Sequence, residues 1–131
     1  MTQGAALWML AAAVLWGLGQ LFWSSTMARR QQGFDWGVGP RDEPRPLHGQ
    51  AARLDRAYRN YLETFPLYAA LLLAALAADK LSALTAWGAA LYLAGRLAYT
   101  PLYAIGVPVL RTVVWLIAIA GLMLMLAALL V

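Results

Sequence analysis

The chain has 131 residues, of which 63% are hydrophobic and only 12% are charged, and its net charge is +4. A soluble globular domain needs more charged surface than this, so the main solvent of the chain is predicted to be lipid. The basic residues lie between apolar segments rather than on one soluble face, which argues against nucleic acid as a partner. Because there is no cysteine, disulfides and thiolate metal sites are excluded, no metal site is predicted, and any thiol chemistry must come from a bound small molecule.

The first predicted element is a membrane-spanning helix over residues 5–30. Residues 5–28 contain no charged side chain, and they exceed the length of about 20 residues that a spanning helix requires. No Lys or Arg precedes Arg29, so the basic start of a signal peptide is missing and we expect the segment to remain in the membrane. Residues 33–46 are charged and repeatedly interrupted by Gly and Pro, which predicts a loop.

The second predicted helix covers residues 49–78. Its apolar part, residues 65–78, would cover only about 21 Å at ~1.5 Å per residue, whereas the hydrocarbon core is ~30 Å thick. The helix must therefore extend back through Asn60 and Glu63. Their polar groups then lie at or inside the membrane boundary, where each needs a partner within the protein. Pro66 is expected to kink this helix.

Two further helices are predicted over residues 81–103 and 108–131. The first is apolar until Arg96, and Pro108 suits the first turn of the second. The predicted fold is therefore an all-α integral membrane protein, with one domain over residues 1–131 that forms a bundle of four transmembrane helices.

The charges are distributed unevenly between the two ends of this predicted bundle. All nine arginines lie at the end of the first helix, in the following loop, early in the second helix, late in the third or early in the fourth, and only Lys80 lies at the opposite end. By the positive-inside rule, the long loop and the connection between the last two helices are predicted to be cytoplasmic, with both termini outside.

Two polar stripes are predicted near the arginine-rich end. At ~100° per residue, the second helix places four polar side chains on one arc of about 80°, and these are Arg53, Arg56, Asn60 and Glu63. The third helix carries a similar stripe, formed by Tyr92, Arg96, Tyr99 and Tyr103. Arg111 in the fourth helix, and Arg29 and Arg30 at the end of the first, belong to the same end of the bundle. We expect these residues to form one basic, tyrosine-lined site.

Such a site suits a hydrophilic anionic or zwitterionic ligand from the cytoplasm and an apolar co-substrate from the lipid. Arginine binds carboxylates bidentately, Glu63 suits an ammonium group, and Asn60 and tyrosine hydroxyls supply further hydrogen bonds. Glutathione offers two carboxylates, an amine and a thiol. An arginine beside that thiol would favour the thiolate over a reference thiol pKa of roughly 8.5.

Some of these charged residues could have a purely structural role instead of binding a ligand. Some arginines are expected mainly to set the orientation of the chain in the membrane, namely Arg41, Arg45 and Arg59. Glu63 could form a structural ion pair with Arg56 or with Arg96.

Residues 56–66, with the sequence RAYRNYLETFP, resemble a signature of the MAPEG family, the membrane-associated proteins of eicosanoid and glutathione metabolism. The shared pattern is R-x-x-x-N-x-x-E-x-x-P. Residues 95–99, GRLAY, together with Tyr103 and residues 111–112, look like the second signature of the family. The loop over residues 33–46 is similar to that of a bacterial subgroup.

The resemblance implies a homotrimer in a bacterial inner membrane, with glutathione bound between neighbouring subunits near the cytoplasmic face. Matched position by position, the glutathione contacts would be Arg56, Asn60, Glu63, Tyr99 and Tyr103. Arg111 would lie beside the thiol as the activating catalytic residue, and Arg29 or Arg30 would close the site from the first helix. Some eicosanoid synthases have a tyrosine after the glutamate, where this chain has Thr64, so eicosanoid substrates are not implied.

Three functions compete at this point. The first is a glutathione-dependent transferase or peroxidase that acts on lipophilic electrophiles or lipid hydroperoxides. The second is a non-catalytic trimeric membrane protein of the same fold that binds a lipid or another anion. The third is a small multidrug transporter, but such transporters usually carry an essential carboxylate in the first helix, and residues 5–30 have none.

Overall fold

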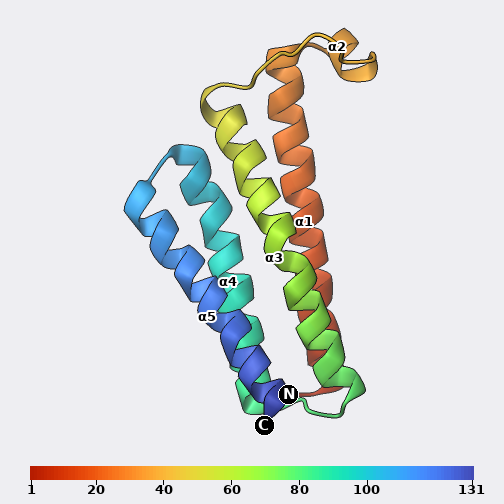
Figure 1. The fold of residues 1–131 in the computed structure, drawn as a ribbon, viewed down its shortest axis with the longest axis vertical. Coiled ribbons are helices and arrows are strands. Elements are labelled where there is room, and N and C mark those ends of the chain that lie inside the picture. Colours follow the sequence, from red (N-terminus) through yellow and green to blue (C-terminus); the bar gives the residue numbers. More distant parts are fainter.

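The computed structural model describes all residues 1–131 and consists of helices joined by loops. Four helices are long: α1 (Gln3–Gln32), α3 (Gly49–Ala77), α4 (Ala83–Ile105) and α5 (Pro108–Leu130). One short helix, α2 (Phe34–Val38), lies between α1 and α3. Figure 1 shows two antiparallel hairpins, α1 with α3 and α4 with α5, which lie side by side and separate toward the end that carries α2.

The ends of the helices follow local sequence signals. α4 begins with a capping box in which Ser82 and Thr85 exchange side-chain and backbone hydrogen bonds, and it ends where Gly106 adopts a left-handed conformation. Pro108 occupies the first turn of α5. α3 continues through Pro66. The observed bounds differ by at most two residues from the predicted ranges, which were 5–30, 49–78, 81–103 and 108–131.

The connection between α1 and α3 contains a short helix, and side chains hold it in place by hydrogen bonds to its own backbone. Gly33 ends α1 with a φ of 88°, and α2 follows directly. Gln32 Nε2 donates to the Arg45 carbonyl (2.6 Å), and Arg45 Nη1 donates back to the Gln32 carbonyl (2.7 Å). Trp36 Nε1 donates to the Glu43 carbonyl (2.7 Å). The predicted loop is therefore a folded cap on one end of the bundle.

Three of the long helices, α1, α3 and α5, are long and apolar enough to cross a membrane. α4 has 23 residues, as α5 does. It is not among these candidate spans, and it carries Arg96 and the tyrosines of the predicted polar stripe. Of the four predicted membrane helices, three are therefore confirmed as candidate spans.

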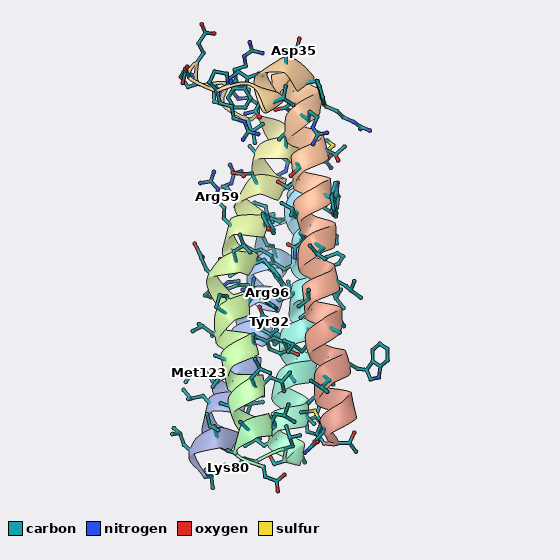
Figure 2. All side chains as sticks on the ribbon, turned by 90° about the vertical axis from the view of Figure 1, so that its right-hand side faces the viewer. Asp35, Arg59, Lys80, Tyr92, Arg96 and Met123 are labelled. Atoms are coloured by element: carbon teal, nitrogen blue, oxygen red, sulfur yellow. The ribbon has the colours of Figure 1, made fainter.

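The two chain termini lie at the same end of the bundle, opposite to α2 (Figure 1). Lys80 also lies at this end, where its Nζ donates to the Leu129 carbonyl (2.9 Å), whereas Asp35 of α2 lies at the far end (Figure 2). Arg96 lies between these ends, and only 1% of its surface is exposed. Arg96, which was predicted to belong to the arginine-rich end, therefore has its guanidinium buried inside the bundle.

α4 and α5 pack closely because small residues face one another. A Cβ added to Gly121 would lie 2.5 Å from the carbonyl oxygen of Gly88, and a Cβ on Gly95 would lie 2.7 Å from that of Val114. Cβ atoms do not approach carbonyl oxygens so closely, so these positions require glycine. Small residues allow this kind of backbone approach between membrane helices.

Replacing Gly121 with alanine is expected to destabilise the fold by about 1–3 kcal/mol, because the added methyl group forces α5 away from α4. The free energy of unfolding, followed by circular dichroism during titration with SDS, measures the effect. Gly4→Ala is the matched control, since a Cβ on Gly4 meets nothing within 4 Å. Equal stability of the two variants would contradict the close packing of α4 on α5.

Candidate functional site

Two residues of the polar stripe on α3, Asn60 and Glu63, are hydrogen-bonded to each other. Asn60 Nδ2 donates to Glu63 Oε2 (3.2 Å), and Asn60 Oδ1 accepts from Arg96 Nη1 of α4 (2.8 Å). The ion pair considered for Glu63, with Arg56 or Arg96, is not observed, because the one ion pair of the chain lies elsewhere on α3. The Glu63 carboxylate therefore has no cationic partner within the chain, and its side chain is exposed on the surface of α3.

Tyr103 on α4 joins Arg56 of α3 to Arg111 of α5. Arg56 Nε donates to the Tyr103 hydroxyl (3.1 Å). The central guanidinium carbon of Arg111 lies 4.2 Å from the centre of the Tyr103 ring, which is a cation–π contact. The rings of Tyr99 and Tyr103 meet edge to face, with their centres 5.5 Å apart. The Arg111 N–H groups donate to no other group of the chain, so they are available to a ligand.

A cavity of about 200 Å³ opens where these side chains meet. Its lining is polar and aromatic and consists of Asn60, Tyr99, Tyr103, Arg111, Thr112 and Trp115. Arg56 and Glu63 lie beside it through their hydrogen bonds to Tyr103 and Asn60. The structure therefore brings six of the eight predicted site residues together, from three different helices.

Arg29 and Arg30 are the two predicted site residues that lie apart from this cavity. Both are exposed in the last turn of α1, and Arg29 lines a separate pocket next to α2. α1 packs against α3 and α4 but not against α5, the helix that carries Arg111. Within one chain, the first helix therefore contributes no arginine to the cavity.

Arg96 supports the site from inside the bundle. Its Nη2 donates to the Thr64 hydroxyl, which shares a further hydrogen bond of 3.1 Å with the Tyr92 hydroxyl. The guanidinium also lies 5.6 Å and 5.4 Å from the ring centres of Tyr92 and Tyr99. Figure 2 shows Arg96 and Tyr92 close together in the middle of the bundle. Hydroxyl, amide and aromatic groups, rather than a carboxylate, therefore stabilise this buried charge.

Three residues acquire roles that were not predicted from the sequence. Thr64 is only 7% exposed and points toward Arg96, so it belongs to the interior network and does not line the cavity. Thr112 and Trp115 do line it. Trp115 follows Arg111 by four residues on α5, and this spacing places both side chains on one helix face. The helical spacing that identified the stripes on α3 and α4 would also have placed Trp115 beside Arg111 on α5.

The cavity suits a ligand that carries both an anionic and a cationic group. Arg111 brings a guanidinium group to the lining, and Arg56 and Glu63 lie beside the cavity with a second guanidinium group and a carboxylate. The Tyr103 hydroxyl accepts from Arg56. A thiol held beside Arg111 would be favoured as the thiolate, because the positive charge lowers the free energy of the ionised sulfur. This donor set fits the carboxylates, amine and thiol of glutathione. No group of three or more His, Asp or Glu side chains gathers in the geometry that holds a metal ion.

The chain matches a known protein family. The sequence matches the model of the MAPEG family over residues 9–131, which is nearly the whole chain. No individual curated protein matches it.

Proposed function

Since the chain belongs to the MAPEG family of membrane proteins in eicosanoid and glutathione metabolism, we propose that it is a glutathione-dependent transferase or peroxidase embedded in the membrane. The observation that carries this proposal is the Arg111 guanidinium, which lines the cavity, stacks on Tyr103 and has its N–H groups available. A cation in this position stabilises a glutathione thiolate relative to the thiol.

The stabilised thiolate serves either reaction. In the transferase reaction its sulfur attacks an electrophilic carbon, a C–S bond forms, and the leaving group departs with its electron pair. With a hydroperoxide, the sulfur attacks oxygen, the O–O bond breaks and the alcohol leaves. A second glutathione then reduces the oxidised sulfur, which gives glutathione disulfide and water. In both reactions Arg111 acts by lowering the free energy of the charged nucleophile.

The remaining groups bind the peptide part of glutathione. Arg56 suits a carboxylate, since its Nε holds Tyr103 and its two Nη groups make no hydrogen bond in the chain. Glu63 suits the ammonium group, and Asn60 holds its carboxylate in place through the 3.2 Å hydrogen bond. Tyr99 and Tyr103 supply hydroxyl groups at the cavity wall. The lipophilic substrate reaches the sulfur from the surrounding lipid.

The proposed enzyme is a homotrimer with its sites between neighbouring copies. The cavity of one chain, about 200 Å³, is smaller than the ~300–1,000 Å³ of most ligand sites. Glu63 lies about 21 Å from the start of α3 at ~1.5 Å per residue, near the middle of the helix, and is exposed. An ionised carboxylate facing lipid at that depth would cost at least about 2.5 kcal/mol. A neighbouring copy that covers Glu63 and adds its own Arg29 or Arg30 removes this cost and completes the site.

In this assembly α4 is the fourth membrane span. It is as long as α5 and runs alongside it (Figure 1). Its most polar side chain, Arg96, bonds to Asn60 and Thr64 and is therefore shielded from lipid. By the positive-inside rule, the α2 end faces the cytoplasm and both termini lie outside, in a bacterial inner membrane.

Calorimetric titration of the full-length protein with glutathione tests the proposal. Glu63→Gln is expected to weaken binding about 10- to 100-fold, because a hydrogen bond to a charged group contributes ~1.5–3 kcal/mol. Asp79→Asn is the matched control, since Asp79 lies beside Lys80 at the opposite end of the bundle. Absence of binding to the unmodified protein, or equal losses in both variants, would contradict the proposed site.

A further inference from the structure

A second, larger pocket lies under the folded cap, between the end of α1, the loop and the start of α3. Its volume is about 480 Å³, against about 200 Å³ for the cavity beside Arg111. The charged residues of its lining are Arg41, Arg45, Arg56, Arg59 and Asp55. Four guanidinium groups thus face a single carboxylate, and nothing in the glutathione site requires three of these arginines. We call this region the cap pocket.

The depth of the cap pocket follows from the length of α1. This helix has 30 residues and is about 45 Å long at ~1.5 Å per residue. That length covers the ~30 Å hydrocarbon core together with both headgroup layers. Ala28 and Gln32, which line the pocket, stand in the last two turns of α1. The cap pocket therefore lies at the level of the lipid headgroups.

The structure holds the arginines of the cap pocket in place while leaving N–H groups unused. Arg45 donates from one Nη to the Gln32 carbonyl. Arg41 donates from Nε and from one Nη to the Gly37 carbonyl. Arg59 uses only its Nε, which pairs with Asp55 at 3.0 Å, and its side chain is 74% exposed. Figure 2 shows Arg59 projecting from α3 below the loop. Each of these guanidinium groups retains donors for a further acceptor.

Apolar side chains accompany the charges. Trp36, Pro46 and Leu47 line the cap pocket. Phe34 and Val38 of α2 are 62% and 69% exposed and line a neighbouring pocket that shares Trp36 with it. An aromatic and aliphatic surface next to an arginine cluster fits a molecule with an anionic head and an apolar tail. A free inorganic anion would leave these apolar groups in water.

From these observations we propose that the cap pocket binds the headgroup phosphate of an anionic phospholipid. The arginines bind the phosphate, and the apolar lining residues Trp36, Pro46 and Leu47 pack against the part of the lipid next to its headgroup. This site is independent of glutathione use, since Arg56 is the only residue it shares with the site proposed above. Bound lipid would hold α2 and the loop against the bilayer.

Native mass spectrometry of the full-length protein in a neutral detergent tests this proposal. Added dioleoylphosphatidylglycerol is expected to remain bound at one molecule per chain, whereas dioleoylphosphatidylcholine, which has the same acyl chains but no net charge, is not. Arg59→Gln and Arg45→Gln are each expected to weaken retention about fivefold, the effect of one basic residue near an anionic lipid surface. Asp55→Asn removes the only carboxylate of the pocket and is expected to strengthen retention by a similar factor.

The controls separate this site from a general charge effect and from a folding defect. Lys80→Gln removes one positive charge at the opposite end of the bundle and is expected to leave lipid retention unchanged. Asp55→Asn can strengthen lipid binding only if the protein is folded and the pocket is intact. Its result therefore tests the proposal even if Arg59→Gln or Arg45→Gln loses binding because it fails to fold. Equal retention of the two lipids, or equal losses in Lys80→Gln and Arg59→Gln, would overturn the proposal. Displacement of the phosphatidylglycerol by inorganic phosphate alone would also overturn it, since the ligand would then be the free anion.

Discussion

Replacing Arg111 with alanine is expected to abolish the thiolate absorbance of bound glutathione and to lower turnover by about 10²–10³-fold, the usual cost of removing one group that stabilises developing charge. Its guanidinium lines the cavity and has its N–H groups available. The loss should therefore fall on the ionisation of the thiol and on kcat. Glutathione affinity should fall only modestly, because Arg56 and Glu63 remain to hold the peptide.

Absorbance in the ultraviolet and steady-state kinetics measure the two effects separately. Arg59→Ala is the matched control, since it removes an arginine from the same end of the bundle without touching the cavity. An Arg111→Ala protein that retained the full thiolate signal would show that another group activates the sulfur.

Replacing Arg96 with leucine is expected to have the second large effect, on both stability and glutathione affinity. Arg96 donates to Asn60 and to Thr64, and it is 1% exposed. Without it, the Asn60 and Thr64 oxygens each lose a charged donor, and a hydrogen bond to a charged group is worth ~1.5–3 kcal/mol. Asn60 also loses the bond that fixes its carboxamide, so Glu63 is no longer held. We expect a lower free energy of unfolding and a glutathione affinity at least tenfold weaker.

Arg96→Lys separates the two contributions. Lysine retains the positive charge but does not present the planar fork that reaches Asn60 and Thr64 together. Stability should recover in part, while glutathione affinity should stay low because Asn60 is still free to rotate. Unfolding in SDS and calorimetric titration provide the two measurements. Unchanged affinity in both variants would show that Arg96 has no positioning role.

The long helices were predictable because their signals are local. Hydrophobic length located α1 and α5, and the need to complete a span extended α3 back through Asn60 and Glu63. Helical spacing predicted which polar residues share a face, and five of them meet at or beside the cavity: Arg56, Asn60, Glu63, Tyr99 and Tyr103. These features depend on the periodicity of one helix at a time.

Features that depend on how two helices pack were not predictable in this way. Arg96 was assigned to the polar stripe near the arginine-rich end, but spacing along one helix does not predict burial. Its burial depends on α3, which presents Asn60 and Thr64 to it. The sequence left Arg56 and Arg96 open as ion-pair partners of Glu63. In the structure, the Glu63 carboxylate instead accepts a hydrogen bond from Asn60. Arg29 and Arg30 lie apart from Arg111 because α1 does not touch α5 within one chain.

The most direct test of the central claim is to titrate the unmodified protein with glutathione near neutral pH and to record thiolate absorbance. We expect a signal that saturates as binding saturates, and no signal with S-methylglutathione, which has the same peptide groups but no ionisable thiol. Absence of both binding and thiolate absorbance would contradict the assignment of Arg111 and its neighbours as a glutathione-activating site.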